Sequence, residues 1–204
     1  MSPLYNLDQE IFRSIHVGLH RAWLDPFMVS ITDSGRGEVK FAILGLLCLF
    51  VRYRKYAFMV LVAGATSGLL AQLVKHLVYR QRPSNFAFAH PITSYIEALM
   101  NQHAPMAGNS FPSGHATSSF AIAVAVAWIV RKTEHAWIGW VVVLWAALVG
   151  FSRVYVGVHF LSDVLGGAAI GALVGTLVFL LWKKKNWIPE IQTVSNLPID
   201  RNRS

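Results

Sequence analysis

Long apolar runs divide this chain into segments with the length of membrane spans. A transmembrane helix needs about 20 mainly apolar residues, and three segments reach or approach that length. They are Tyr56–Tyr79, Trp137–Phe151, which extends toward Tyr155, and His159–Trp182. Two further apolar segments, Ser113–Val130 and Val39–Val51, are shorter. The pattern predicts an all-α, polytopic transmembrane helix bundle of five to six spans.

Small residues recur in the last of these segments. Gly167, Gly171 and Gly175 are spaced four apart, so on a helix they form one stripe. Such a stripe lets a neighbouring helix approach closely, which is a common packing device in membranes. We therefore expect this segment to pack tightly against another helix.

The segment Leu7–Thr32 fits two positions in a membrane. Apolar side chains recur there at helical spacing, but charged residues and histidines interrupt them. The apolar positions are Ile11, Ile15, Leu19, Trp23 and Phe27, and the interrupting ones are Arg13, His16, His20, Arg21 and Asp25. An N-terminal amphipathic helix lying at the interface fits better than a sixth span. Both alternatives stay open, and with them the side of the membrane that holds the N-terminus.

Composition supports a membrane protein, since 54% of the residues are apolar and only 14% are charged. The formal net charge is +8. The basic residues lie at the ends of apolar runs, which argues against nucleic-acid binding and favours anionic lipid headgroups as partners. Cys48 is the single cysteine, so neither an intramolecular disulfide nor a thiolate metal cluster is expected. Met1–Glu10 lacks the pattern of a removable signal peptide.

Basic residues in short loops predict the orientation of the chain. Three such regions alternate consistently along the spans, so all can face the cytoplasm. They are Arg52–Lys55, Arg131–Lys132 and Lys183–Lys185. The opposite, extracytoplasmic face then holds the loop Arg80–Pro112 and the junction Ser152–Val158. We expect residues 1–186 to form one transmembrane domain and residues 187–204 a flexible cytoplasmic tail.

The loop Arg80–Pro112 is long for a compact protein, which points to a function or to disorder. Its apolar side chains make disorder a poor explanation. They are Phe86, Phe88, Tyr95, Ile96, Leu99, Met100 and Met106. Anchoring at the membrane surface and gripping a lipid tail fit these residues equally well.

Three clusters place ionisable or small polar residues at a membrane boundary, where such groups are costly unless they have a function. In the first, Lys75 and Arg82 are seven apart, and on a helix they would project from nearly one face. Pro83 favours ending the helix there. The pair predicts a two-pronged cationic grip. By the same geometry Arg80 points elsewhere, and we expect its guanidinium to reach toward lipid headgroups.

The second cluster is Pro112, Ser113, Gly114 and His115, directly before an apolar helix. Ser113 is a good helix cap, and the first amides of the helix can bind an anion. Gly114 lets the backbone approach an oxyanion closely. His115 would lie within reach of whatever these amides hold.

In the third cluster, Ser152 and Arg153 end one span, and His159 and Asp163 open the next. His159 and Asp163 are four apart, so on a helix the carboxylate lies one turn from the imidazole. A hydrogen bond between them would fix the tautomer and leave the other ring nitrogen free to attack. The pattern indicates an activated nucleophile, although each residue alone also fits an interfacial or helix-dipole role.

Together the clusters form a three-part pattern: Lys75 through six residues to Arg82-Pro83, then Pro112-Ser113-Gly114-His115, then Ser152-Arg153 through five residues to His159 and three more to Asp163. This pattern resembles the complete signature of the type 2 phosphatidic acid phosphatase family. The resemblance implies a helical membrane fold and hydrolysis of lipid phosphates through a phosphohistidine, without a metal or other cofactor.

Position by position, the resemblance implies that His159 is the nucleophile, Asp163 orients it, and His115 is the general acid. It further implies that five residues hold the phosphoryl oxygens, namely Lys75, Arg82, Ser113, Gly114 and Arg153. No protein partner is expected.

Within the resemblance, recycling of undecaprenyl diphosphate at the bacterial inner membrane is the first choice, because the chain is short. Phosphatidylglycerol phosphate, phosphatidic acid and lipid A phosphates stay open as substrates. A transporter would scatter its ionisable residues along a path, whereas here they gather at one face. A vanadate-dependent haloperoxidase shares the phosphate-shaped site by family resemblance, but the apolar spans argue against that soluble class. An inactive lipid-binding relative would have lost motif residues, and none is missing.

Overall fold

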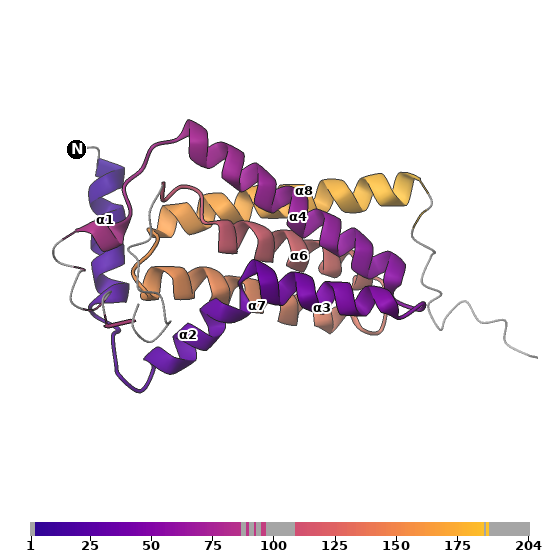
Figure 1. Ribbon diagram of the computed structural model, residues 1–204, viewed down its shortest axis with the longest axis horizontal. Helices are drawn as coiled ribbons and strands as arrows, with labels where there is room; N and C mark the ends of the chain where they lie inside the picture. Colours follow the sequence, from indigo (N-terminus) through magenta and orange to yellow (C-terminus); the bar gives the residue numbers. More distant parts are fainter. Residues whose placement is uncertain are drawn as a thin grey trace, which may run out of the picture.

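The computed structural model describes residues 3–86, 89, 92, 95–96, 109–185 and 187. These residues form seven α-helices and one short 3-10 helix, with no strand in this part of the chain. The elements are α1 (Pro3–His16), α2 (Asp25–Ser34), α3 (Gly37–Leu49), α4 (Arg54–Leu77), η1 (Pro83–Asn85), α6 (Gly114–Val130), α7 (Ala136–Tyr155) and α8 (Leu161–Lys184). In Figure 1, α3, α4, α6, α7 and α8 run alongside one another, and α1 crosses one end of the bundle. The predicted all-α class is confirmed.

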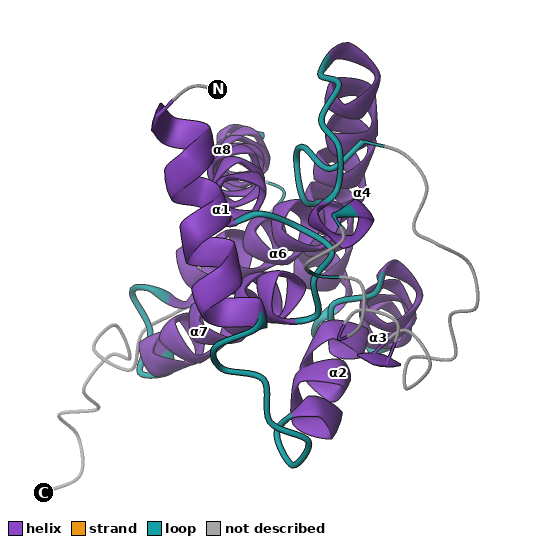
Figure 2. Cartoon of the chain, turned by 90° about the vertical axis from the view of Figure 1, so that its left-hand side faces the viewer, coloured by secondary structure: helices purple, strands orange, loops and turns teal. Residues whose placement is uncertain are grey.

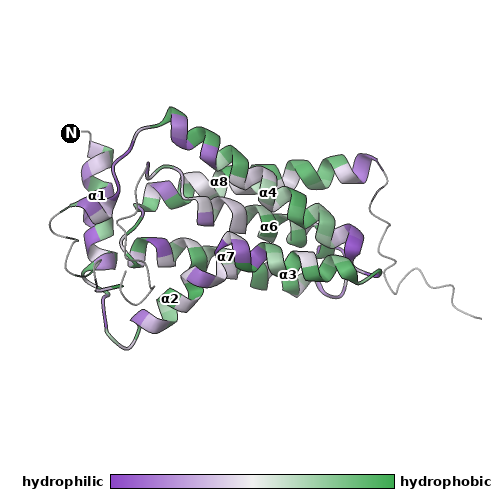
Figure 3. Cartoon of the chain, viewed as in Figure 1, coloured by the Kyte–Doolittle hydropathy of each residue, from purple (hydrophilic) through white to green (hydrophobic). Residues whose placement is uncertain are grey.

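Three helices, α4, α7 and α8, are long and apolar enough to cross a membrane, and α6 is apolar but shorter. They lie within a few residues of the predicted segments. Large apolar side chains on these helices stay exposed, which suits contact with lipid, and hydrophilic residues gather toward the helix ends (Figure 3). The chain is a membrane protein, and the total of five to six spans stays a prediction.

The N-terminal segment differs from the single amphipathic helix that the spacing predicts. It forms two helices, α1 and α2, separated by the connection 17–24. The Gly18 amide donates to the Arg13 carbonyl oxygen near the end of α1, and Pro26 lies in the first turn of α2. Both residues favour helix ends, so the apolar spacing continues while the backbone breaks. The position of α1 at a membrane interface stays a prediction.

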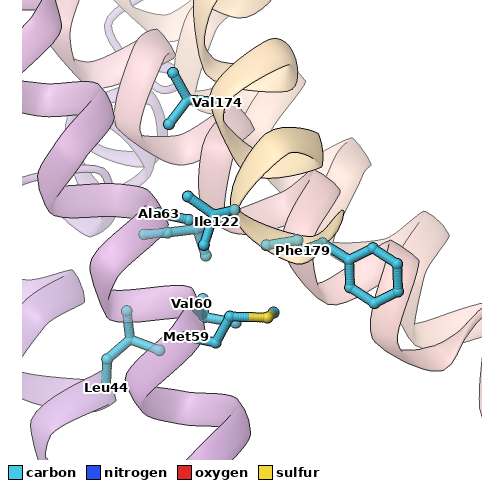
Figure 4. Packing of buried hydrophobic residues seen from close by; sticks show 9 residues of the cluster. Leu44, Met59, Val60, Ala63, Ile122, Val174 and Phe179 are labelled. Carbon is cyan, nitrogen blue, oxygen red and sulfur yellow. The ribbon is translucent and has the colours of Figure 1, made fainter. Parts of the chain in front are cut away.

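The core surrounds α6, which packs against α4, α7 and α8. Its largest apolar cluster joins four helices: Leu44 from α3, Met59, Val60 and Ala63 from α4, Ile122 and Ala125 from α6, and Val174, Val178 and Phe179 from α8 (Figure 4). Small side chains on α6 keep the helices close.

The glycine stripe does pack as the sequence predicts. A Cβ at Gly167 would lie 2.7 Å from the Ser113 carbonyl oxygen, at Gly171 2.2 Å from that of Thr117, and at Gly175 2.5 Å from that of Ala121. All three contacts are with α6 backbone or its cap, so α8 and α6 touch along several turns. The backbones approach closer than any side chain would allow.

The two ends of the bundle carry different groups. The α3–α4 and α6–α7 connections and the end of α8 lie at one end, together with the basic regions predicted to face the cytoplasm. The end of α4, the starts of α6 and α8, and the end of α7 meet at the other end (Figure 1). The signature residues therefore share one end of the molecule.

Part of the loop Arg80–Pro112 packs inside the protein. Phe86 lies against the cluster formed by Phe12 and Phe160, and Ile96 is buried beside Tyr155. Tyr95 is exposed and its ring contacts His20. The remaining predicted loop residues, Phe88, Leu99, Met100 and Met106, and the predicted tail beyond residue 187 lie outside the described residues.

We expect Gly171→Ala to destabilise the bundle by about 1–3 kcal/mol, because its methyl group would overlap the α6 backbone. Gly68→Ala on α4 is the matched control, since a Cβ there meets no atom within 4 Å. Alanine stabilises a helix by about 1 kcal/mol relative to glycine, so the melting temperature of the control should be no lower than that of the wild type. Thermal unfolding in detergent measures both, and equal melting of the two variants would contradict the packing.

Candidate active site

His159 lies in the tight connection between α7 and α8. Gly157 has a φ of 86°, a left-handed conformation that glycine adopts without strain. The amides of Val158 and His159 both donate to the Arg153 carbonyl oxygen at 3.2 Å. This turn brings the His159 side chain inward, where it is only 3% exposed. Burial lowers the pKa of His159 to about 3, against the opposing effect of Asp163, so the imidazole is neutral.

Asp163 faces His159, but through a different geometry from the one predicted. Phe160 caps α8, so His159 precedes the helix and the two residues do not share one turn. Asp163 stands at the third helical position and accepts from the Phe160 amide at 2.9 Å with Oδ2. The same oxygen lies 3.5 Å from His159 Nδ1, longer than an ordinary hydrogen bond. The carboxylate therefore folds back over the start of the helix to reach the ring.

Arg82 lies on the other side of the ring. Its NH1 donates to the Val158 carbonyl oxygen at 3.1 Å and lies 3.4 Å from His159 Nε2. Its Nε is buried and has no hydrogen-bond partner among the described residues. The ring nitrogen that is turned away from Asp163 thus faces a cation with donor capacity to spare.

The predicted shared helix face for Lys75 and Arg82 is wrong. The helix α4 ends at Leu77, and Arg82 is extended at φ −75° and ψ 149°. Pro83 restricts the residue before it to such an extended conformation. Lys75 Nζ donates to the carbonyl oxygens of Asn109 and Ser110 at 2.7 and 3.4 Å. The two cations still lie close enough for their charges to interact.

Ser113 and Gly114 begin α6 as predicted. The Ser113 hydroxyl accepts from the Ala116 amide at 3.5 Å, and its own amide donates to the Asp163 carbonyl oxygen at 3.0 Å. A Cβ at Gly114 would meet nothing within 4 Å, so the glycine borders open space. Gly114 and His115 line a groove of about 440 Å³ between the starts of α3 and α6 and the middle of α4.

His115 stands in the first turn of α6 with its Nε2 buried and without a hydrogen-bond partner in the described part of the chain. Arg153 and His159 are among its electrostatic neighbours. Arg153, near the end of α7, is buried, and its NH1 donates to Thr32 Oγ1 at 3.0 Å. The structure thus brings all three signature segments together at one end of the bundle.

Several residues of this site lay beyond sequence reasoning. Ser110 donates to Asp163 Oδ2, and Thr32 of α2 binds Arg153. Lys40 of α3 is buried, donates to Ser118 and Ser119 of α6, and interacts electrostatically with His115 and Arg153. Lys40 stands in an apolar run, and that interruption is the one sequence signal that could have found it.

Arg80 also differs from the prediction. Its guanidinium points into the protein instead of toward lipid headgroups, and its NH1 donates to Asp163 Oδ1 at 2.6 Å. Its NH2 donates to Asp8 Oδ2 of α1 at 2.5 Å. The predicted geometry failed because α4 ends three residues before Arg80, so helical spacing no longer sets the direction of its side chain.

Comparison with known proteins supports one family. The family model described as PAP2 superfamily matches residues 52–187, more than half of the chain. Undecaprenyl-diphosphatase BcrC of Bacillus subtilis (strain 168) is 37% identical over 180 residues, which cover 85% of this chain and 83% of that protein. A lipid A 4'-phosphatase of Porphyromonas gingivalis is 26% identical over 196 residues, covering 92% of this chain and 79% of that protein.

A solved structure gives the same result. The crystal structure of a transmembrane PAP2 type phosphatidylglycerolphosphate phosphatase from Bacillus subtilis superposes with a TM-score of 0.73 at 26% identity. The superposition covers 94% of this chain and 90% of that one. The chain belongs to the PAP2 superfamily and is a membrane hydrolase that acts on phosphoric ester or anhydride bonds.

Proposed function

We propose that this protein hydrolyses a lipid phosphate or diphosphate through a phosphohistidine on His159, and that undecaprenyl diphosphate is its preferred substrate. One observation carries the mechanism: a buried, neutral imidazole has Asp163 at its Nδ1 and the Arg82 guanidinium at its Nε2. The first contact favours a proton on Nδ1, and the second supports binding of a phosphoryl oxygen beside Nε2.

In the first step, Nε2 of His159 attacks phosphorus and the bond from phosphorus to the leaving oxygen breaks. His115 gives its proton to that oxygen. In the second step, water attacks phosphorus and the bond from phosphorus to Nε2 of His159 breaks, while His115 takes a proton from the water and inorganic phosphate leaves. Two transfers through a covalent intermediate replace one difficult step.

The charge of the site matches the demands of phosphoryl transfer. The transition state spreads negative charge over three equatorial oxygens, and catalysis depends on placing cations and donors around them. Lys75, Arg82 and Arg153 would supply the cations, and Ser113 and Gly114 would supply donors at the start of α6. Each fixed donor contributes on the order of 3 kcal/mol in a site that excludes water.

The substrate proposal rests on the relatives together with the architecture. The relative at 37% identity is named an undecaprenyl-diphosphatase, and others are named for lipid A and phosphatidylglycerophosphate. A site at the end of a membrane-spanning bundle suits a lipid whose tail stays in the bilayer. Phosphatidylglycerol phosphate, phosphatidic acid and lipid A phosphates are the alternatives.

For the cellular setting we propose the bacterial inner membrane. The basic residues at the end of the bundle opposite the site favour a cytoplasmic C-terminus and an active site on the extracytoplasmic face. Residues 1–186 would form the single phosphatase domain, with 187–204 as a cytoplasmic tail.

We expect the full-length protein in detergent to release inorganic phosphate fastest from undecaprenyl diphosphate in a panel that also holds phosphatidylglycerol phosphate, phosphatidic acid and lipid A. Phosphate release at equal lipid-to-detergent ratio measures the rates. A higher kcat/KM on another lipid would assign that lipid as the substrate and leave the proposed reaction unchanged. No release from any lipid would refute the function.

We expect His159→Ala and His115→Ala to lower kcat on the best substrate by on the order of 10³-fold or more, since each removes a group that takes part in bond making or breaking. His135→Ala is the matched control, because His135 is 61% exposed at the opposite end of the bundle. Phosphate release from proteins with wild-type melting profiles tests this. Wild-type turnover in His159→Ala would rule out the assigned nucleophile.

We also expect EDTA to leave phosphate release unchanged. Cationic side chains of the site can supply the charge that a divalent ion supplies in many other phosphatases. The measurement is the rate before and after dialysis against EDTA, with magnesium added back. Loss of activity that magnesium restores would contradict the proposed mechanism.

A further inference from the structure

We propose that Asp8 and Arg80 are positioning residues that hold Asp163, and through it the imidazole of His159, in the reactive geometry. The inference rests on the proposed function, because it gives the pair a role in the His159 reaction. Neither residue belongs to the three-part signature, and Asp8 lies outside the residues 52–187 that the family model matches. It would make α1 a working part of the active site.

The Asp163 carboxylate divides its contacts between its two oxygens. Its Oδ1 accepts from Arg80 NH1 at 2.6 Å. Its Oδ2 accepts from the Ser110 hydroxyl and the Phe160 amide and faces His159 Nδ1 at 3.5 Å. The contact with Arg80 is therefore far shorter than the contact with the nucleophile. Because Arg80 holds one oxygen, rotation of the carboxylate would break a short contact, which favours the orientation with Oδ2 directed at the ring.

Arg80 is itself held at both terminal nitrogens of its guanidinium. The Arg80 side chain is 18% exposed, so its guanidinium can turn toward solvent unless both terminal nitrogens are bound. Asp8 Oδ2 accepts from Arg80 NH2 at 2.5 Å while Asp163 holds NH1. The guanidinium carbon also lies 4.4 Å from the centre of the Phe160 ring. Arg80 is thus clamped between two carboxylates and an aromatic face.

Asp8 is held in its position by contacts with α8. Its carboxylate also accepts from the Ser162 amide at 3.1 Å and from the Ser162 hydroxyl, so it binds the first turn of α8 directly. On the same side of α1, Phe12 packs edge-on against Phe160 at 5.6 Å, and His16 Nδ1 lies 2.7 Å from the Tyr155 carbonyl oxygen. Figure 2 shows α1 lying across the end of the bundle. These contacts fix α1 against both sides of the turn that carries His159.

A purely structural tie between α1 and the bundle would use the same contacts, so the test must separate stability from chemistry. A positioning role changes kcat in folded protein and leaves KM nearly unchanged, because it acts through the orientation of Asp163 and His159 and not through substrate binding. A structural tie changes the amount of folded protein. Misplacing a reacting group by about 1 Å can cost on the order of 100-fold in rate.

The experiment uses the full-length protein in detergent and the best substrate of the lipid panel, at a temperature well below the melting point of each variant. We expect Asp8→Asn and Arg80→Gln to lower kcat by about 10–100-fold with KM within about twofold. Asp8→Glu, which restores a carboxylate, should recover most of the lost kcat. Glu10→Gln on the exposed face of α1 is the matched control and should keep the wild-type kcat.

The double variant Asp8→Asn with Arg80→Gln tests whether the two residues act as one unit. We expect it to lose no more kcat than Arg80→Gln alone, since Asp8 acts through Arg80. Arg80→Lys keeps the charge but loses the planar fork whose two nitrogens bind Asp163 and Asp8 separately, so it should also lower kcat. It provides the test if Arg80→Gln does not fold.

Three results would overturn the inference. They are a wild-type kcat in folded Asp8→Asn and in the folded Arg80 variant, a loss confined to KM, and a loss that disappears once rates are divided by the folded fraction. Each leaves the proposed function intact, because the wild type still releases phosphate. A wild-type protein that hydrolyses no lipid phosphate refutes the proposed function, and this inference falls with it.

Discussion

The close approach of α6 and α8 is the constraint on which the site depends. Three glycines of α8 lie so close to the backbone of α6 or its cap that a Cβ on any of them would overlap a carbonyl oxygen. Where the two helices begin, the Ser113 amide donates to the Asp163 carbonyl oxygen, which joins the first turn of α6 to the first turn of α8. His115 lies in the first turn of α6, and His159 lies just before the start of α8. In a membrane, where apolar side chains gain little by leaving lipid, such close packing is a main source of helix association.

A second constraint is that charge buried at one end of an apolar bundle must find partners. Arg82 binds the Val158 carbonyl oxygen, Arg153 binds Thr32, and Lys75 binds carbonyl oxygens near residue 110. The acceptors in these contacts are neutral oxygens, so these hydrogen bonds do not themselves neutralise the cations. Asp163 and Asp8 are instead joined to Arg80. Under the proposed mechanism, these three cations would face the phosphate, whereas Arg80 would order the carboxylate behind the nucleophile.

Hydropathy recovered the fold well because each span is a local property of the chain. The ends of α4, α6, α7 and α8 fall within a few residues of the apolar segments, and the glycine spacing located the closest helix contact. Helical spacing failed where the backbone leaves the helix. Arg82 and His159 both lie outside helices, so counting turns gave the wrong geometry for Lys75 with Arg82 and for His159 with Asp163. His159 and Asp163 still face each other at 3.5 Å, and Lys75 and Arg82 still lie close enough for their charges to interact.

The sequence by itself determined the membrane class, the helical segments, the clustering of basic residues at one end and the signature residues at the other, because residue order and hydropathy carry that information directly. The tertiary structure decided which groups surround Asp163. Asp8 is separated from Arg80 by 72 positions and from Ser162 by 154, so no spacing rule links them. They meet only because α1 packs across the end of the bundle, where apolar contacts of Phe12 and Phe160 bring two buried carboxylates to one guanidinium.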